Sequence, residues 1–333
     1  MTHAIDIHTH VVPAEFPAYA GAHGGRAWPS MAAAHDCHHK HVMIDGKNFR
    51  TVTDECWDVG RRLDAMARMK IARQVLSPMP ELLSYWLPVD DAVPLIRHVN
   101  ATIADMVARA PDKFIGLGGV PMQDPELAAR ELERLMRDGF KGVELGSNIN
   151  GAPLGDPRFE SFFAAAEELG AAVFVHALHP SGKERIVGPP GLMAYIGFPL
   201  ETAYAIASLI TGGTLTRHPG LRLAFSHGGG AFASILPRLA HGWTIKKDFA
   251  ALMGESPYAH ARRLYYDTLV YDAATLRQLI QLFGVRQLCL GTDFPFDIHE
   301  RHPVEAVAAL QLSDGDVTLL HHDNAARFLG VSE

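Results

Sequence analysis

Short apolar runs alternate along the chain with longer segments in which apolar residues recur at helical spacing. Runs of this kind are typical of buried strands when turn residues bound them. Eight such runs are present: Ala4 to His8, Ala72 to Ser77, Phe114 to Val120, Gly142 to Leu145, Ala172 to His176, Leu221 to Ser226, Leu264 to Thr268 and Gln287 to Gly291. Strands that alternate with helices indicate βα units and a parallel sheet.

Two of the intervening helices carry clear boundary signals. Asp124-Pro125 opens one that closes at Gly139, and Asp156-Pro157 opens another that closes at Gly170. An Asp N-cap, a Pro in the first turn and a Gly just past the end are typical helix boundaries.

Eight βα units in a chain of 333 residues predict an α/β fold, a (β/α)8 TIM barrel formed by residues 1–333 as a single domain. A doubly wound open sheet is the alternative. It is less favoured because no Gly-rich phosphate loop follows the first strand, where His8-Thr9-His10 stands instead.

Residues 13–57 do not follow the barrel rhythm and predict a small insertion after the first strand. Within it, Val42 to Ile44 and Phe49 to Val52 flank Asp45-Gly46, which is a strong hairpin signal. We expect the insertion to lie over the end of the barrel that carries the active site. The His-rich segment 35–41 inside it is interpreted as a solvated loop, because its histidines are too dense for one strand face.

Polar residues stand where four of the predicted strands end. His8 and His10 share one face of the first strand, because side chains alternate with period 2. The fifth strand ends in His176, the sixth runs into His227, and the eighth runs into Asp293. The C-terminal ends of barrel strands converge, and imidazole with carboxylate suits zinc or a similar divalent ion. These positions together predict a shared metal site.

These segments resemble the amidohydrolase superfamily, in the branch of mononuclear metal-dependent decarboxylases that includes the α-amino-β-carboxymuconate-ε-semialdehyde decarboxylase family. The resemblance covers nearly the whole chain and is carried by Ile5 to His10, Gly46 to Arg50, Val175-His176, Ser226 to Gly230, Arg238 and Gly291 to Phe296.

The resemblance implies that His8, His10, His176 and Asp293 bind one zinc ion per chain, with manganese as an alternative, and that Asp293 and His227 are catalytic. His227 would be the acid/base residue beside the metal-bound water. Zinc lowers the pKa of its water to about 7, where a histidine can move protons.

Two-metal members of the superfamily bridge their ions with a lysine or glutamate at the end of the fourth strand. Here Lys141 lies at the opposite end of that strand and Glu144 stops short of its rim. One metal is therefore preferred, and Glu144 is the residue that would argue for two.

The resemblance also implies substrate-binding residues. Arg50 and Arg238 match arginines that hold substrate carboxylates, Arg238 from across a homodimer interface, and a guanidinium suits that role because its donors pair bidentately. Lys47 is a weaker candidate, and surface salt bridges are the alternative for both arginines. The Pro/Gly-rich segment 188–195 departs from the family pattern, so Tyr195 would shape a different pocket.

The function hypothesis is a zinc-dependent, non-oxidative decarboxylase, a carboxy-lyase, that acts on a small unsaturated or aromatic carboxylate. A hydrolase or hydratase on the same scaffold, with a C–C bond, lactone or amide as substrate, is the first alternative. A non-catalytic binding barrel is the second, and it would require the metal residues to be coincidental.

Composition narrows the partners and the location. The net charge of −7, from 37 acidic and 30 basic residues, argues against nucleic acid and anionic membranes. No uninterrupted apolar run reaches about 18 residues, and Met1 to His10 lacks the pattern of a signal peptide, so we expect a cytoplasmic protein.

Overall fold

The computed structural model describes residues 3–189 and 191–331. A strand forms in each of the eight stretches predicted from the sequence. These strands are β1 (Ile5–Val11), β5 (Arg73–Pro78), β6 (Phe114–Gly116), β7 (Gly142–Gly146), β10 (Ala172–His176), β11 (Arg222–Phe225), β12 (Tyr265–Asp267) and β13 (Leu288–Cys289).

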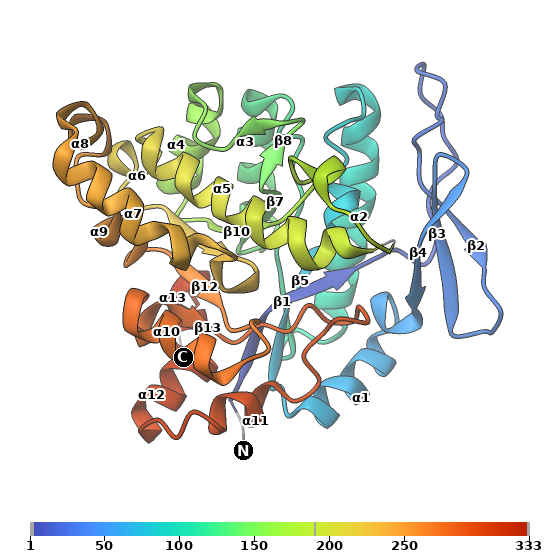
Figure 1. The fold of residues 1–333 in the computed structure, drawn as a ribbon. Coiled ribbons are helices and arrows are strands. Elements are labelled where there is room, and N and C mark those ends of the chain that lie inside the picture. Colours follow the sequence, from blue (N-terminus) through green and yellow to red (C-terminus); the bar gives the residue numbers. More distant parts are fainter. Residues whose placement is uncertain (1–2, 190, 332–333) are drawn as a thin grey trace.

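The strands close into a parallel barrel. They pair in the orders β1-β5-β6 and β13-β12-β11-β10-β7. Parallel bridges between Thr9 and Phe294 and between Gly118 and Val143 join the edges of the two sheets. The predicted TIM barrel is therefore confirmed (Figure 1).

Four barrel strands, β6, β11, β12 and β13, are shorter than the sequence predicted, and beyond β6 and β13 other groups take up backbone hydrogen bonds. Beyond β6, the side chain of Asn100 accepts from the Gly119 N–H at 2.7 Å and donates to its carbonyl at 2.9 Å. Beyond β13, the Leu290 N–H donates to the carbonyl of Leu320 at 3.1 Å. The apolar runs predicted burial correctly but could not show these partners.

Helices cover the outside of the barrel (Figure 1). They are α1 (Val59–Met69), α2 (Val89–Arg109), α3 (Pro125–Arg137), α4 (Glu160–Glu168), α5 (Phe198–Thr211), α6 (Thr214–Arg217), α7 (Phe232–Ile245), α8 (Lys247–Met253), α9 (Pro257–Ala261), α10 (Ala273–Phe283), α11 (Pro303–Ala308), α12 (Asp314–Thr318) and α13 (Asn324–Leu329).

The predicted helix boundaries hold with one change. Asp124 caps α3 by accepting from the Leu127 N–H at 3.0 Å. After Asp156, Pro157–Phe159 forms a 3-10 turn, and the α-helix begins only at Glu160.

The insertion after β1 forms a three-stranded antiparallel sheet of β2 (Ser30–Ala33), β3 (His39–Ile44) and β4 (Lys47–Thr53). Asp45 and Gly46 both have positive φ, 53° and 70°, as the predicted tight hairpin requires. The sequence did not predict β2, whose four residues have no alternating pattern. Figure 1 shows this sheet, in blue, at the end of the barrel toward which β1 runs. A further hairpin joins β8 (Asn148–Ile149) to β9 (Ala152–Pro153).

Among the described residues, one helix is long and apolar enough to cross a membrane by length and composition. It runs through Met193–Thr211 with a mean hydropathy of 1.3, and 44% of it is buried. Its α5 part packs against α6 and α7. Glu201 and Thr202 interrupt the apolar run in the sequence, and both are buried against the protein. These contacts are those of a barrel helix.

Candidate active site

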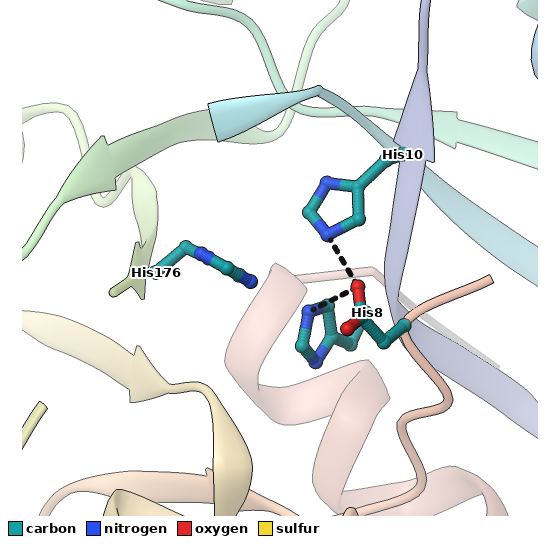
Figure 2. A group of neighbouring side chains, drawn as sticks. His8, His10 and His176 are labelled. Atoms are coloured by element: carbon teal, nitrogen blue, oxygen red, sulfur yellow. Dashed lines mark ion pairs between the residues drawn. The ribbon is translucent and has the colours of Figure 1, made fainter. Parts of the chain in front are cut away.

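Four side chains converge at the C-terminal end of the barrel. His8 and His10 come from β1, His176 ends β10, and Asp293 follows β13. Their ligand atoms all lie within 4.8 Å of one another, and all four residues are buried. Figure 2 shows the three imidazoles facing one centre, with dashed lines to the carboxylate that lies 3.0 Å from His10 Nε2 and 3.5 Å from His8 Nε2.

The atoms that face this centre have no hydrogen-bond partner among the described residues. They are the three Nε2 atoms of the histidines and Oδ1 of Asp293, and all are buried. Buried polar atoms are almost always paired, so four orphans at one point call for a missing partner. Three imidazole nitrogens and one carboxylate oxygen are the ligand types that zinc and similar divalent cations bind. A buried site able to hold a metal is therefore present.

The opposite nitrogen of each imidazole is held in place, which fixes the direction of Nε2. His8 Nδ1 donates to Asp267 at 2.6 Å. His10 Nδ1 donates to the Pro78 carbonyl at 3.1 Å, and His176 Nδ1 donates to the Ala177 carbonyl at 2.8 Å. A proton on Nδ1 leaves the Nε2 lone pair free for a metal.

Burial keeps two of these histidines neutral. It lowers the pKa of His10 to about 4 and holds the pKa of His176 well below its usual value. Burial also acts to lower the pKa of His8, but the hydrogen bond with Asp267 and the charge of Asp293 outweigh it and raise that pKa. At neutral pH, His10 and His176 are therefore in the form that binds metal.

Asp267, at the end of β12, was missed by the sequence analysis. Its Oδ2 contacts His8 and accepts from the His227 N–H at 2.9 Å, and its Oδ1 accepts from the Gly228 N–H at 2.7 Å and the Leu269 N–H at 3.0 Å. One carboxylate thus positions a candidate ligand and the loop of His227. A signal existed, because Asp267 lies at the end of the seventh predicted strand.

Arg62 of α1 is a second residue that the sequence analysis missed. It is fully buried, and its guanidinium donates to Thr9 Oγ1 at 2.7 Å, the His10 carbonyl at 3.0 Å and Gln74 Oε1 at 2.9 Å. These hydrogen bonds hold β1 in place at the position of its two histidines. Nothing in the sequence distinguishes it from the other arginines.

His227 lies beside the centre, with its ring 5.4 Å from that of His8 and 5.0 Å from that of His176. Its Nδ1 is 3.1 Å from Ser226 Oγ. Burial lowers its pKa, aided by the charge of His8. Both His227 and Asp293 have left-handed backbones, with φ of 57° and 67°. Such conformations are strained outside glycine and concentrate at functional sites.

A cavity of about 680 Å³ opens onto these residues, a volume that suits a small organic ligand. Its walls include Arg50, Glu81, His176, Tyr195, His227, Asp293 and Phe296.

In one wall of the cavity, a guanidinium group stacks on aromatic rings. The Arg50 guanidinium lies 4.1 Å from the centroid of Phe296, and Phe296 stacks on His10 at 5.0 Å. Among the described residues, Arg50 forms no ion pair within 4.0 Å. Its donors are available to a ligand.

The other predicted substrate residues occupy different places. Tyr195 lines the cavity and is 64% exposed. Lys47 is exposed at the start of β4, and Arg238 is exposed on α7; neither lines the cavity of the single chain. Residue 190 of the Pro/Gly-rich segment lies outside the described residues.

Glu144 and the insertion provide further candidate ligands. Glu144 is buried, and neither of its carboxylate oxygens has a hydrogen-bond partner in the described part of the chain. It lies 3.7 Å from His10 Nδ1 but is outside the group of four. Burial raises its pKa well above the usual value.

In the insertion, His35, Asp36 and His39 also have ligand atoms within 4.8 Å of one another. These residues are largely exposed, and ion pairs between them account for their proximity.

Comparisons with known proteins agree with this geometry. The family profile described as Amidohydrolase matches residues 5–331. A 2-amino-3-carboxymuconate-6-semialdehyde decarboxylase of Dictyostelium discoideum is 37% identical over 331 residues, which cover 98% of this chain and 91% of that protein.

Solved structures share the fold. The apo form of Metarhizium anisopliae IDCase superposes with a TM-score of 0.84 at 20% identity, covering 99% of this chain and 98% of its own. The 5-carboxyvanillate decarboxylase of Novosphingobium aromaticivorans, complexed with manganese and 4-hydroxy-3-methoxy-5-nitrobenzoic acid, superposes with a TM-score of 0.75 at 25% identity, covering 84% and 82%. Because the Amidohydrolase family profile matches nearly the whole length of this chain, the chain belongs to the amidohydrolase family.

Proposed function

We propose that this protein is a metal-dependent, non-oxidative decarboxylase of a small aromatic or unsaturated carboxylic acid. The observation that carries the proposal is the set of four orphaned ligand atoms at the base of a cavity that also contains an unpaired arginine. The named decarboxylases among its relatives support the same chemistry, and they act on acids of this class.

His8, His10, His176 and Asp293 would hold the metal, one ion per chain. A divalent ion in that position supplies a Lewis acid that polarises an oxygen of the substrate. Zinc suits the three imidazoles and one carboxylate, and manganese, which the 5-carboxyvanillate decarboxylase structure contains, is the alternative.

His227 is the proposed acid/base residue. Because its Nδ1 is occupied by Ser226 Oγ, Nε2 is the nitrogen left to exchange a proton with the substrate. Burial lowers its pKa and so favours the neutral form, which takes up a proton from the solvent before it donates one. That proton goes to the carbon that loses its carboxylate. As the new C–H bond forms, the bond to the carboxylate breaks and CO2 leaves.

Arg50 is proposed to hold a carboxylate of the substrate. Its guanidinium is fixed by stacking on Phe296, so it loses little freedom when it pairs with a ligand. Tyr195 would contact the other end of the substrate at the mouth of the cavity. Lys47 is a weaker candidate, because it lies outside the cavity wall.

A homodimer is proposed to complete the site with Arg238 of the partner subunit. Arg238 is exposed on α7, and Ile235 one turn earlier is 39% exposed. The neighbouring helix α5 exposes Leu200 and Tyr204, at 48% and 61%. Exposed apolar side chains on two packed helices, one of which also exposes an arginine, are suited to pairing with a second copy.

The proposal is tested by replacing His227 with Ala and measuring metal content and CO2 release on the same sample. We expect metal content to be retained and turnover to fall by about 10²–10⁴-fold. The control is His23→Ala, on an exposed loop of the insertion. Wild-type turnover in the His227 variant would overturn the assignment. A wild-type product with added water, in place of CO2, would favour the hydrolase or hydratase.

A further inference from the structure

Glu81 is a buried carboxylate in the cavity wall that the mechanism above does not use. It lies in the turn Pro80–Leu83, directly after β5, and is 6% exposed. Pro80 before it and Leu82 after it are also buried, so the turn holds its backbone firmly. The Glu81 side chain lines the same cavity as Arg50, His227 and Asp293.

One oxygen of this carboxylate lacks a partner. Oε2 of Glu81 is buried and has no hydrogen bond within the described part of the chain. Burial raises the pKa of Glu81, while the charge of Arg50 and the backbone N–H of Glu81 act in the opposite direction. An unsatisfied buried acceptor of this kind is unfavourable and calls for a partner. In the wall of a cavity, a ligand can supply that partner.

A direct ion pair with Arg50 does not explain the buried carboxylate of Glu81. Among the described residues the two side chains form no ion pair within 4.0 Å, although the charge of Arg50 acts on Glu81, and Oε2 of Glu81 remains without a partner. Nor does Glu81 belong to the group of four candidate metal ligands. Arg50 and Glu81 therefore line the same cavity, and in the part of the chain that the structure describes Arg50 has no ion pair and Glu81 has one unpaired carboxylate oxygen.

A ligand that satisfies both groups must carry a carboxylate and a hydrogen-bond donor. Building on the decarboxylase proposal, we propose that Glu81 is a specificity-determining residue whose free oxygen accepts a hydrogen bond from an amino or hydroxyl group of the substrate. The cavity then selects amino- or hydroxy-substituted carboxylic acids over unsubstituted or O-methylated ones. Sites with a buried polar group discriminate in this way because an analogue that lacks the donor leaves the group unpaired.

The test is a binding titration of the metal-loaded protein by calorimetry, which does not depend on turnover. The ligands are benzoate and the three ring isomers each of aminobenzoate and hydroxybenzoate. The variants are Glu81→Leu, which removes the acceptor at similar size, and Glu81→Gln, which retains a carbonyl acceptor without the charge. Glu133→Leu, on the exposed face of α3, is the matched control.

We expect the wild type to bind at least one amino or hydroxy isomer about tenfold or more tightly than benzoate, since benzoate leaves the buried acceptor unpaired. Glu81→Leu should bring this ratio to within about twofold of one while leaving the benzoate affinity nearly unchanged. Glu81→Gln should retain part of the preference for the hydroxy isomer. The control should match the wild type.

Three results would overturn the inference. The wild type could lack any isomer preference, or Glu81→Leu could keep the preference intact, which would assign it to the metal or to Arg50. Glu81→Leu could also weaken every acid equally and lower the melting temperature, as expected if Glu81 only supports Arg50. If the preference is lost in Glu81→Leu but no acid releases CO2, the inference about Glu81 stands and the decarboxylase proposal fails.

Discussion

At the scale of single residues, the candidate metal centre depends on the groups behind the ligands as much as on the ligands themselves. Asp267 is the clearest case, because one carboxylate receives a hydrogen bond from His8, two from the backbone N–H groups of His227 and Gly228, and one from the Leu269 N–H. It fixes the imidazole orientation and makes His8 a stronger donor to a cation.

Asp267→Asn is therefore expected to weaken metal binding by about 10–100-fold. Asparagine keeps the size of the side chain but removes the charge that supports His8. The affinity is measured by competition with a chromophoric chelator, and circular dichroism confirms that the variant is folded. Asp248→Asn, at an exposed position of α8, is the control. An affinity equal to that of the wild type would show that Asp267 does not support the ligand.

The residue scale also shows how far the sequence could predict the site. His8, His10, His176 and Asp293 were predicted because each stands where an apolar strand ends, and the structure brings them together. Asp267 stands near the end of the seventh predicted strand, Leu264 to Thr268, but was not predicted as a site residue. Glu81 could not be found, since its significance lies in the burial of an unpaired oxygen, which no sequence pattern reports.

At the scale of elements, helix α1 and strand β1 are joined by Arg62. Its guanidinium binds two groups of β1, the Thr9 hydroxyl and the His10 carbonyl, and also Gln74 of β5. These hydrogen bonds hold β1, which carries two of the candidate ligands, in place although the insertion begins directly after it.

Arg62→Met is expected to lower the free energy of unfolding by about 3 kcal/mol, because several buried acceptors lose their donor. Urea denaturation followed by circular dichroism measures the change. Arg68→Met is the matched control on the same helix: Arg68 is exposed and forms a surface ion pair with Glu55, so its loss should cost less than about 1 kcal/mol. Equal effects of the two substitutions would contradict the role of Arg62.

The elements themselves were largely predictable. Apolar strand runs and helix boundary residues located the barrel units, and Asp45-Gly46 located the hairpin of the insertion. Strand β2 and the short ends of β6 and β13 were not predictable, because they depend on partners distant in sequence, such as Asn100. Local pattern predicts which segments are buried, whereas tertiary partners decide where each strand stops.

At the scale of the whole molecule, the proposed dimer places Arg238 of one subunit at the site of the other. Arg238→Ala is then expected to lower kcat/KM by about 10²-fold or more, since a charged hydrogen bond to the substrate is lost. Mixing this variant with inactive His227→Ala subunits should restore activity, because a mixed dimer contains one complete site. Activity of the mixture no higher than the sum of its parts would exclude a shared site.

The central claim is that this protein is a metal-dependent decarboxylase. The most direct test of that claim is elemental analysis of the purified protein, combined on the same sample with CO2 release from a panel of carboxylated muconate semialdehydes and hydroxybenzoates. We expect one zinc or manganese ion per chain and CO2 release from at least one amino- or hydroxy-substituted acid. A fully metal-loaded protein that releases no CO2 from any of these acids would contradict the decarboxylase proposal.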